Sequence, residues 1–227
     1  GVICRIGLGY EHLRSINPRL IMVSTSLMGQ TGPIREISGF GSIGAAVAGF
    51  FPFGGWPDRQ PCGPYGAYSD YISPRLTLSV VLAALEHRRS TGLGQHVDYS
   101  QMEAAAQLLS PAFLNDEING VEVMRIGNAD VNYVPHGVYR VVGEDNWLAI
   151  ACEEDSQWVS LSRVIGAHHL SSLGVDERRE RESEIDELIS SWAKNIDGGV
   201  AEVELQSLGV PAHRVLFAPQ VALDPQL

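Results

Sequence analysis

The chain has 227 residues, 44% hydrophobic and 19% charged, which is the balance of a globular protein able to bury a sizeable core. Its net charge of -11 comes without a basic stripe that could neutralise a phosphate backbone, so we do not expect nucleic acid as a partner. No apolar run approaches the roughly 20 residues that a membrane span needs. The three cysteines form no CxxC pair, which argues against a disulfide framework or a structural zinc site, so we expect a location in the reducing cytoplasm.

The first ten residues carry neither a signal-peptide pattern nor an initiator methionine, so we expect a piece of a longer protein. Residues 10–16 place apolar side chains at helical spacing, and residues 20–23 form a short apolar run typical of a buried parallel strand. A Gly/Pro-rich loop at 29–33 leads to small residues at 42–49, which fit a tightly packed helix. This alternation indicates an α/β domain.

A long helix is predicted next. Ser73 and Pro74 form a good N-cap and N1 pair, so the helix is expected to begin there. Thr91 and Gly92 provide its stop signal. A strand at 96–99 follows at once, and then a helix at 101–114, which continues the α/β alternation.

The second half has a different character. Two short apolar runs, 138–142 and 147–151, flank a turn and predict a β-hairpin. Helices are expected at 156–165 and 177–194, and the charged residues 176–187 are assigned to a solvated helix face, since apolar residues recur beside them at helical spacing. The two expected domains are an α/β domain over residues 1–115 and a smaller α+β domain over residues 116–227.

Asp70 is the candidate catalytic residue. It lies in a loop of small and aromatic residues, a few positions before the expected helix N-terminus, where the helix dipole favours an ionised carboxylate. An ionised, partly desolvated aspartate can attack an activated acyl group and form a covalent intermediate. The acyl transfer then proceeds in several steps, each with a lower barrier than the direct transfer. On spacing alone, an aspartate before a helix is more often a cap or a turn residue.

Other catalytic templates fit less well. The chain has no Gly-x-Ser-x-Gly elbow and no HExxH cluster. Gly7 and Gly9 begin a dinucleotide-binding pattern, but His12 stands where a glycine belongs. His168 and His169 have no carboxylate or thiol at ligand spacing. We therefore expect no metal and no permanently bound cofactor.

The stretch from Thr91 to Ser100 reads TGLGQHVDYS. It matches the signature TGxGQxVDVS at every fixed position except Tyr99, and with three other stretches it resembles the family III CoA-transferases. The resemblance extends over nearly the whole chain and implies a partial Rossmann-like large domain followed by a small α+β domain. The other three stretches are residues 5–21, the loop 29–33, and residues 127–139.

The resemblance implies a function and a mechanism. Asp70 would attack a donor thioester to form a mixed anhydride, CoA thiolate would convert the anhydride to an aspartyl-CoA thioester, and CoA would pass to the incoming acid. Acyl-CoA and a small carboxylic acid are then the substrates. Family members form interlocked homodimers with the active site built between subunits, so a homodimer is expected.

Further site residues follow only from the resemblance. Arg5 and Ile6 fall where the family contacts the nucleotide part of CoA, and a guanidinium suits phosphate or adenine. In the family, a glycine-containing loop closes over the active site. Its counterparts here are Gly127, Asn128, Pro135, His136 and Gly137.

One departure leaves alternatives open. Where family transferases often have Gly-Tyr-Asp, this chain has Gly39-Phe40-Gly41. The α-methylacyl-CoA racemases of the same fold carry a catalytic histidine at the position of Phe40, and abstraction of a proton needs a base on each face. A racemase is therefore one alternative. A non-catalytic CoA-binding half of a fused protein is the other.

Overall fold

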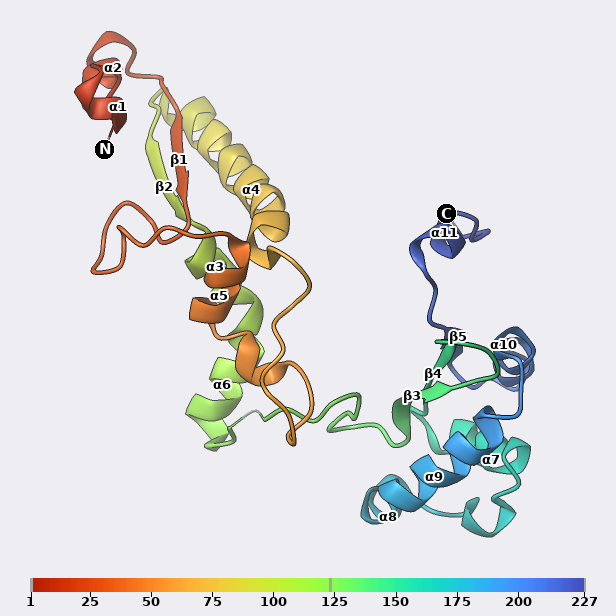
Figure 1. Cartoon of the computed structure of the whole chain (residues 1–227). Coiled ribbons are helices and arrows are strands. Elements are labelled where there is room, and N and C mark those ends of the chain that lie inside the picture. Colours follow the sequence, from red (N-terminus) through yellow and green to blue (C-terminus); the bar gives the residue numbers. More distant parts are fainter. Residues whose placement is uncertain (1, 123, 227) are drawn as a thin grey trace. The chain divides into compact units, whose positions relative to one another are not determined.

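The computed structural model of the protein describes residues 2–122 and 124–226 (Figure 1). The chain forms two compact units, Gly1–Arg125 and Ile126–Leu227, each described here by itself. The expected boundary at 115/116 between a large and a small domain stays a prediction. None of the helices in the described ranges has both the length and the apolar character needed to cross a membrane.

The first unit contains a parallel pair of strands connected through helices. Strands β1 and β2 pair in parallel, from Met22 opposite His96 to Ser26 opposite Ser100. Helix α3 packs against α4 and α5, and α4 packs against α5. This parallel pairing with helical connections confirms the α/β class expected for this part. The elements are α1 (Val2–Arg5), α2 (Tyr10–Ile16), β1 (Met22–Ser26), α3 (Gly41–Ala48), α4 (Tyr68–Thr91), β2 (His96–Ser100), α5 (Gln101–Ala106) and α6 (Ser110–Asn119).

The expected start of the long helix at Ser73 and Pro74 is wrong. Helix α4 begins at Tyr68, so Pro74 lies inside the helix. A proline in this position leaves the carbonyl four residues earlier, that of Asp70, without its helical donor. The first turn forms nevertheless, because Gly66 supplies the positive φ of 65° that precedes it and α3 packs onto the turn.

Two other boundaries differ from expectation. Strand β1 begins at Met22, two residues after the start of the predicted run 20–23. The predicted helix 101–114 is interrupted by a 3-10 turn, Gln107–Leu109, and resumes as α6. Pro111 occupies the first turn of α6, where a missing amide breaks no helical hydrogen bond.

The second unit is an antiparallel sheet covered by helices. The strand order is β3-β4-β5, with Val138 opposite Ala149 and Ile150 opposite Ala212. The predicted hairpin is confirmed, with its first strand two residues earlier than expected. The elements are β3 (His136–Arg140), β4 (Trp147–Ala151), α7 (Asp155–Val164), α8 (Val175–Glu180), α9 (Glu182–Ala193), α10 (Gly198–Ser207), β5 (Ala212–Arg214) and α11 (Ala218–Val221).

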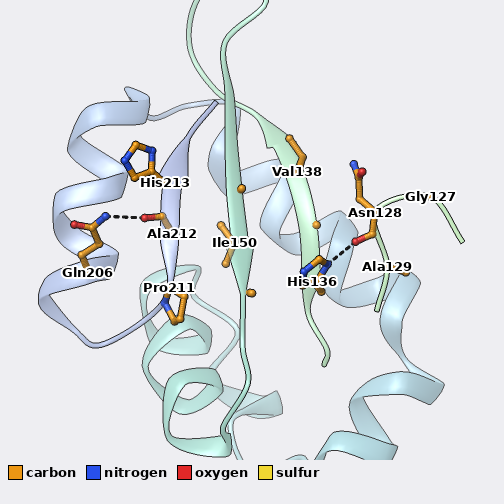
Figure 2. A pocket seen from close by; sticks show the side chains of 13 residues that line it. Gly127, Asn128, Ala129, His136, Val138, Ile150, Gln206, Pro211, Ala212 and His213 are labelled. Carbon is orange, nitrogen blue, oxygen red and sulfur yellow. Dashed lines mark hydrogen bonds between the residues drawn. The ribbon is translucent and has the colours of Figure 1, made fainter. Parts of the chain in front are cut away.

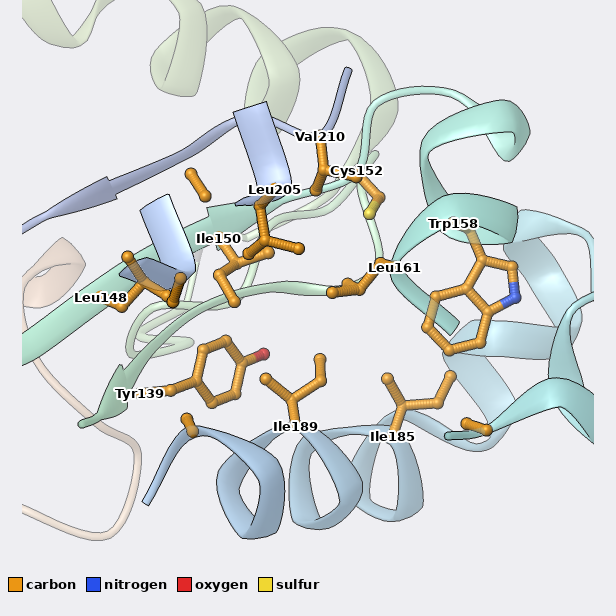
Figure 3. Close-up of a cluster of buried hydrophobic side chains, with 14 of the residues drawn as sticks. Tyr139, Leu148, Ile150, Cys152, Trp158, Leu161, Ile185, Ile189, Leu205 and Val210 are labelled. Atoms are coloured by element: carbon orange, nitrogen blue, oxygen red, sulfur yellow. The ribbon is translucent and has the colours of Figure 1, made fainter. Parts of the chain in front are cut away.

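The core of the second unit lies under one face of this sheet (Figure 3). Leu148 and Ile150 alternate inward along β4 and are fully or almost fully buried. Ile185 and Ile189, one helical turn apart on α9, pack against the same cluster. Trp158 of α7 is also fully buried, and its indole N–H donates to the carbonyl of Leu170 at 2.8 Å.

The predicted single helix 177–194 is two helices, because α8 ends before Arg181 and α9 begins after it. Most of the charged residues in 176–187 are exposed or half-exposed, as expected of a solvated helix face, but Arg178 is an exception. Arg178 is only 1% exposed and lies over the ring of Trp158, with its guanidinium carbon 5.8 Å from the ring centre. Two of its hydrogen-bond partners, Val134 and Asp155, are distant along the chain, so local spacing did not predict its burial.

Candidate functional site

Asp70 lies in the first turn of α4, as the third residue of the helix, and not ahead of it as expected. Its side chain is half-buried, and Oδ2 accepts a hydrogen bond from the backbone N–H of Gly41 at 2.9 Å. Gly41 is the first residue of α3, whose N-cap Phe40 makes no side-chain cap bond. The carboxylate of Asp70 therefore caps a second helix as well as facing the dipole of its own.

The contact between α3 and α4 depends on glycine. A Cβ atom on Gly41 would lie 2.5 Å from the carbonyl oxygen of Ala67 and 2.6 Å from the amide nitrogen of Asp70. A Cβ on Gly44, one turn later, would lie 2.5 Å from the hydroxyl of Ser69. These two glycines let the backbone of α3 approach the first turn of α4 closely.

A pocket of about 410 Å³ opens beside Asp70. Thr25 near the carboxyl end of β1 and Gln101 just after β2 contribute to its wall. Ligands of α/β folds commonly bind at the carboxyl ends of parallel strands, which is where this pocket lies. The remaining lining comes from α4: Ser73, Pro74, Thr77, Leu78 and Val81.

Asp70 also borders a second, more open hollow of about 690 Å³. Arg75 lines this hollow, and its guanidinium donates to the carbonyl of Tyr71 at 3.0 Å. The exposed ring of Tyr71 forms another part of the wall. A ligand can therefore reach the carboxylate of Asp70 from either hollow.

The structure places the predicted loop residues around a different pocket, of about 610 Å³, in the second unit (Figure 2). Gly127, Asn128, His136 and Gly137 all line it. Pro135 does not line this pocket, but it is fully buried and directly precedes His136 in the chain. The floor is the outward face of the sheet, where small side chains of β3 and β4 leave space: Val138, Ala149 and Ala151.

A hydrogen bond closes the loop on this pocket. Nδ1 of His136 lies 2.6 Å from the carbonyl oxygen of Asn128, so Nδ1 carries the proton and donates it. On the opposite wall, the amide of Gln206 donates to the carbonyl of Ala212 at 2.8 Å (Figure 2). The first bond fixes the orientation of the imidazole at the pocket.

Two half-buried acidic residues, Asp186 and Glu182, lie behind the sheet. The hydroxyl of Tyr139 donates to Oδ1 of Asp186 at 2.6 Å. Burial raises the pKa of Asp186, although this hydrogen bond acts in the opposite direction. Burial also raises the pKa of Glu182, and the negative charge of Asp186 adds to that rise. Burial raises the pKa of the Cys152 thiol to about 12.

Arg5 and Ile6 lie at the first short helix of the chain. Arg5 is the last residue of α1, and Ile6 follows it in a turn. Both are exposed, with 64% of Ile6 accessible. Their predicted contact with a nucleotide stays a prediction. In the described ranges, no group of three or more His, Cys, Asp or Glu residues is arranged to hold a metal ion.

Sequence reasoning missed several residues of these sites. Gly41 was interpreted only as a departure from a pattern, although its spacing of three from Gly44 places both glycines on one face of a helix. Thr25 and Gln101 carry no local signal, because the pairing of β1 with β2 brings them to the pocket. Arg178 and Arg179 bind the backbone of residues 130–134, which no local pattern indicates.

Comparison with known proteins identifies relatives over the full chain. The family described as CoA-transferase family III matches residues 1–227. Succinyl-CoA–D-citramalate CoA-transferase of Chloroflexus aurantiacus is 32% identical over 99% of this chain. Succinate–glutarate CoA-transferase of Agrobacterium fabrum is 29% identical, again over 99%. The chain spans 57% of the length of each of these two relatives.

The fold has a solved counterpart. The crystal structure of a CAIB/BAIF family protein from Brucella suis superposes with a TM-score of 0.90 at 30% identity. The match covers 100% of this chain and 60% of that protein. Both expected parts, the partial α/β part and the following α+β part, therefore belong to a known architecture.

Proposed function

The chain belongs to CoA-transferase family III, and on that premise we propose that the protein transfers CoA from an acyl-CoA donor to a small carboxylic acid. The observation that carries the proposal is the position of Asp70. Its carboxylate lies at a pocket of about 410 Å³, with one oxygen held by the amide of Gly41. In the described ranges, no hydrogen bond reaches the other oxygen, Oδ1. That oxygen can therefore act as a nucleophile.

The first half of the proposed reaction loads CoA onto the enzyme. Oδ1 of Asp70 attacks the thioester carbon of the donor, the C–S bond breaks, and CoA leaves as the thiolate. The product is a mixed anhydride of Asp70 and the donor acyl group. The thiolate then attacks Cγ of Asp70, which releases the donor acid and leaves an aspartyl-CoA thioester.

The second half reverses these steps with the acceptor. The carboxylate of the acceptor attacks Cγ of the thioester and expels CoA thiolate, which forms a new anhydride. The thiolate attacks the acceptor's acyl carbon, yields the new acyl-CoA and regenerates the carboxylate of Asp70. One carboxylate therefore serves every step, and no oxidant, metal or external base enters the balance.

Further residues are part of the proposal. We assign contacts with the acyl group to Gly127, Asn128, His136 and Gly137, which share a pocket of about 610 Å³, with Pro135 as the buried support of this loop. The pocket has both apolar floor and polar groups, as sites for small organic molecules do. Contacts with the nucleotide part of CoA are assigned to two exposed residues, Arg5 and Ile6.

We do not propose the alternatives. Phe40 occupies the position of the racemase histidine, and a phenyl ring cannot move a proton. A non-catalytic half is disfavoured by the accessible carboxylate of Asp70. The interlocked homodimer and the cytoplasmic location stay predictions.

A trapping experiment tests the proposed function. The protein is incubated with acyl-CoA, treated with hydroxylamine or borohydride, and the modified residue is mapped by mass spectrometry. We expect modification at Asp70, and loss of both modification and CoA transfer in Asp70→Asn. Asp58→Asn is the control, because Asp58 is an exposed aspartate of the same unit. Modification at another residue, or full activity of Asp70→Asn, would contradict the proposal.

A further inference from the structure

We propose that the backbone amide of Gly41 is a catalytic group. Its hydrogen bond determines which oxygen of Asp70 is exchanged during turnover and which oxygen stays on the enzyme. This inference rests on the proposed function. Oδ1 attacks and is replaced in every turnover. Oδ2 stays on the enzyme and carries the negative charge when Cγ becomes tetrahedral.

The geometry singles out Oδ2. It lies 2.9 Å from the amide nitrogen of Gly41, at the start of the eight-residue helix α3. The first turn of α3 contains no acidic residue, and Phe40 provides no side-chain cap, so Asp70 is the anion that this helix end faces. Donor and acceptor lie at the distance expected of an oxyanion contact.

This contact requires glycine at position 41. The carbonyl oxygen of Ala67 and the amide nitrogen of Asp70 would lie 2.5 and 2.6 Å from an added Cβ. Both are backbone atoms, which cannot rotate aside as a side chain can. In this chain, the glycine that departs from Gly-Tyr-Asp therefore leaves room for the amide to lie within hydrogen-bond distance of Asp70.

The charge on Oδ2 changes during the reaction. In the free carboxylate, Oδ2 shares one negative charge with Oδ1, and in the anhydride and the thioester it is a neutral carbonyl oxygen. When a nucleophile attacks Cγ, Oδ2 takes the full charge. The fixed N–H of Gly41 therefore stabilises the transition states of the two attacks on Cγ most strongly. It contributes less to the attack on the donor thioester, where the charge develops on the substrate.

The same bond controls which oxygen is exchanged. When thiolate attacks Cγ of the anhydride, the bond from Cγ to Oδ1 breaks and the donor acid leaves with that oxygen. The acceptor then brings its own oxygen to Cγ, which remains on Asp70 after the acyl group departs. As long as the carboxylate does not flip, Oδ2 is never exchanged. The hydrogen bond from Gly41 opposes the flip.

Isotope transfer tests the inference. The protein is cycled many times with an acyl-CoA and an acceptor acid labelled with oxygen-18, and the mass of the peptide containing Asp70 is measured. We expect one heavy oxygen in the wild-type protein. A variant whose Gly41 amide is replaced by an ester, which lacks the N–H and adds no Cβ, should take up two. Its kcat should fall by about 100-fold, with a smaller change in KM.

Two side-chain variants separate catalysis from packing. Gly41→Ala should behave like the ester, because its methyl group forces the amide away from Asp70. Gly44→Ala adds a methyl to the same face of α3, but against the side chains of Ser69 and Leu27 and not against the backbone atoms beside the Gly41 amide. It should take up one heavy oxygen and keep kcat within a few-fold of wild type. If Gly41→Ala does not fold, the ester variant decides.

The results that would contradict the role of Gly41 differ from those that would contradict the covalent mechanism. Two heavy oxygens in the wild type, or only one in the ester variant, would overturn the role of Gly41. Equal loss of kcat in the ester variant and in Gly44→Ala would reduce that role to packing. A wild-type protein that transfers CoA without taking up any label at Asp70 would instead refute the proposed covalent mechanism.

Discussion

Nε of Arg178 donates a hydrogen bond to the carbonyl oxygen of Val134 over 2.7 Å, in the interior of the second unit. The same guanidinium reaches the carbonyl of Leu173 at 2.8 Å and the carboxylate of Asp155 at 2.7 Å. Arg179 donates to the carbonyls of Asp130 and Val131. Helix α8 therefore holds, with two consecutive arginines, the segment that leads from the predicted substrate loop into β3.

Removal of the buried arginine should destabilise the second unit strongly. We expect Arg178→Ala to lower the free energy of unfolding by about 3 kcal/mol or more, because two interior carbonyls lose a charged donor and a cavity remains. Asp155→Asn should cost about 1 kcal/mol or less, since the side chain of Asp155 is 71% exposed. Denaturant unfolding measures both. Equal effects would mean that the ion pair, and not the carbonyl contacts, stabilises the unit.

Arg179 is half-buried and acts on the loop rather than on the core. We expect Arg179→Ala to accelerate hydrogen exchange in residues 127–134, because two backbone carbonyls lose their donor. If this segment is part of the substrate site, KM should rise about tenfold, equivalent to about 1.4 kcal/mol, with kcat little changed.

Arg181→Ala is the matched control for this prediction. Arg181 forms a hydrogen-bonded pair with Glu184, and its removal should leave exchange in the loop unchanged. Unaltered exchange in Arg179→Ala would show that the two bonds do not order the segment. Faster exchange with an unaltered KM would separate the segment from substrate binding.

The acidic pair behind the sheet predicts a pH dependence of stability. The folded-state pKa of Glu182 is raised, first by burial and then by the charge of Asp186, while Arg179 acts in the opposite direction. A raised folded-state pKa means that the folded protein binds the proton more tightly than the unfolded chain. This contribution to stability is full below the unfolded pKa of about 4 and is lost as pH rises through the folded-state value.

Glu182→Gln should therefore stabilise the protein relative to wild type at neutral pH and lose this advantage at acidic pH. The measurement is the free energy of unfolding at both pH values. Glu187→Gln, an exposed position on the same helix α9, should show no such difference. An identical pH profile for Glu182→Gln and wild type would contradict the assigned burial effect.

Much of the fold was predictable from local pattern. The helical spacing in residues 10–16 matches α2 residue for residue, and the apolar run 147–151 matches β4. In both cases the hydrophobic period and the turn residues beside it act over a few positions. The start of α4 was not predictable in this way, because its first turn is stabilised by α3 while Ser73 and Pro74 offer a better local start.

The sequence by itself determined the family signature at residues 91–100, the choice of Asp70 as the candidate nucleophile, and the order of helices and strands around it. The signature and the element order depend on residue type and short spacing, whereas the choice of Asp70 depends on its place among the flanking family motifs. Only the tertiary structure decided that the amide of Gly41 donates to Asp70 and that Arg178 is buried against the carbonyl of Val134. The partners in these two hydrogen bonds lie 29 and 44 positions apart along the chain, and only tertiary packing brings such groups within hydrogen-bond distance.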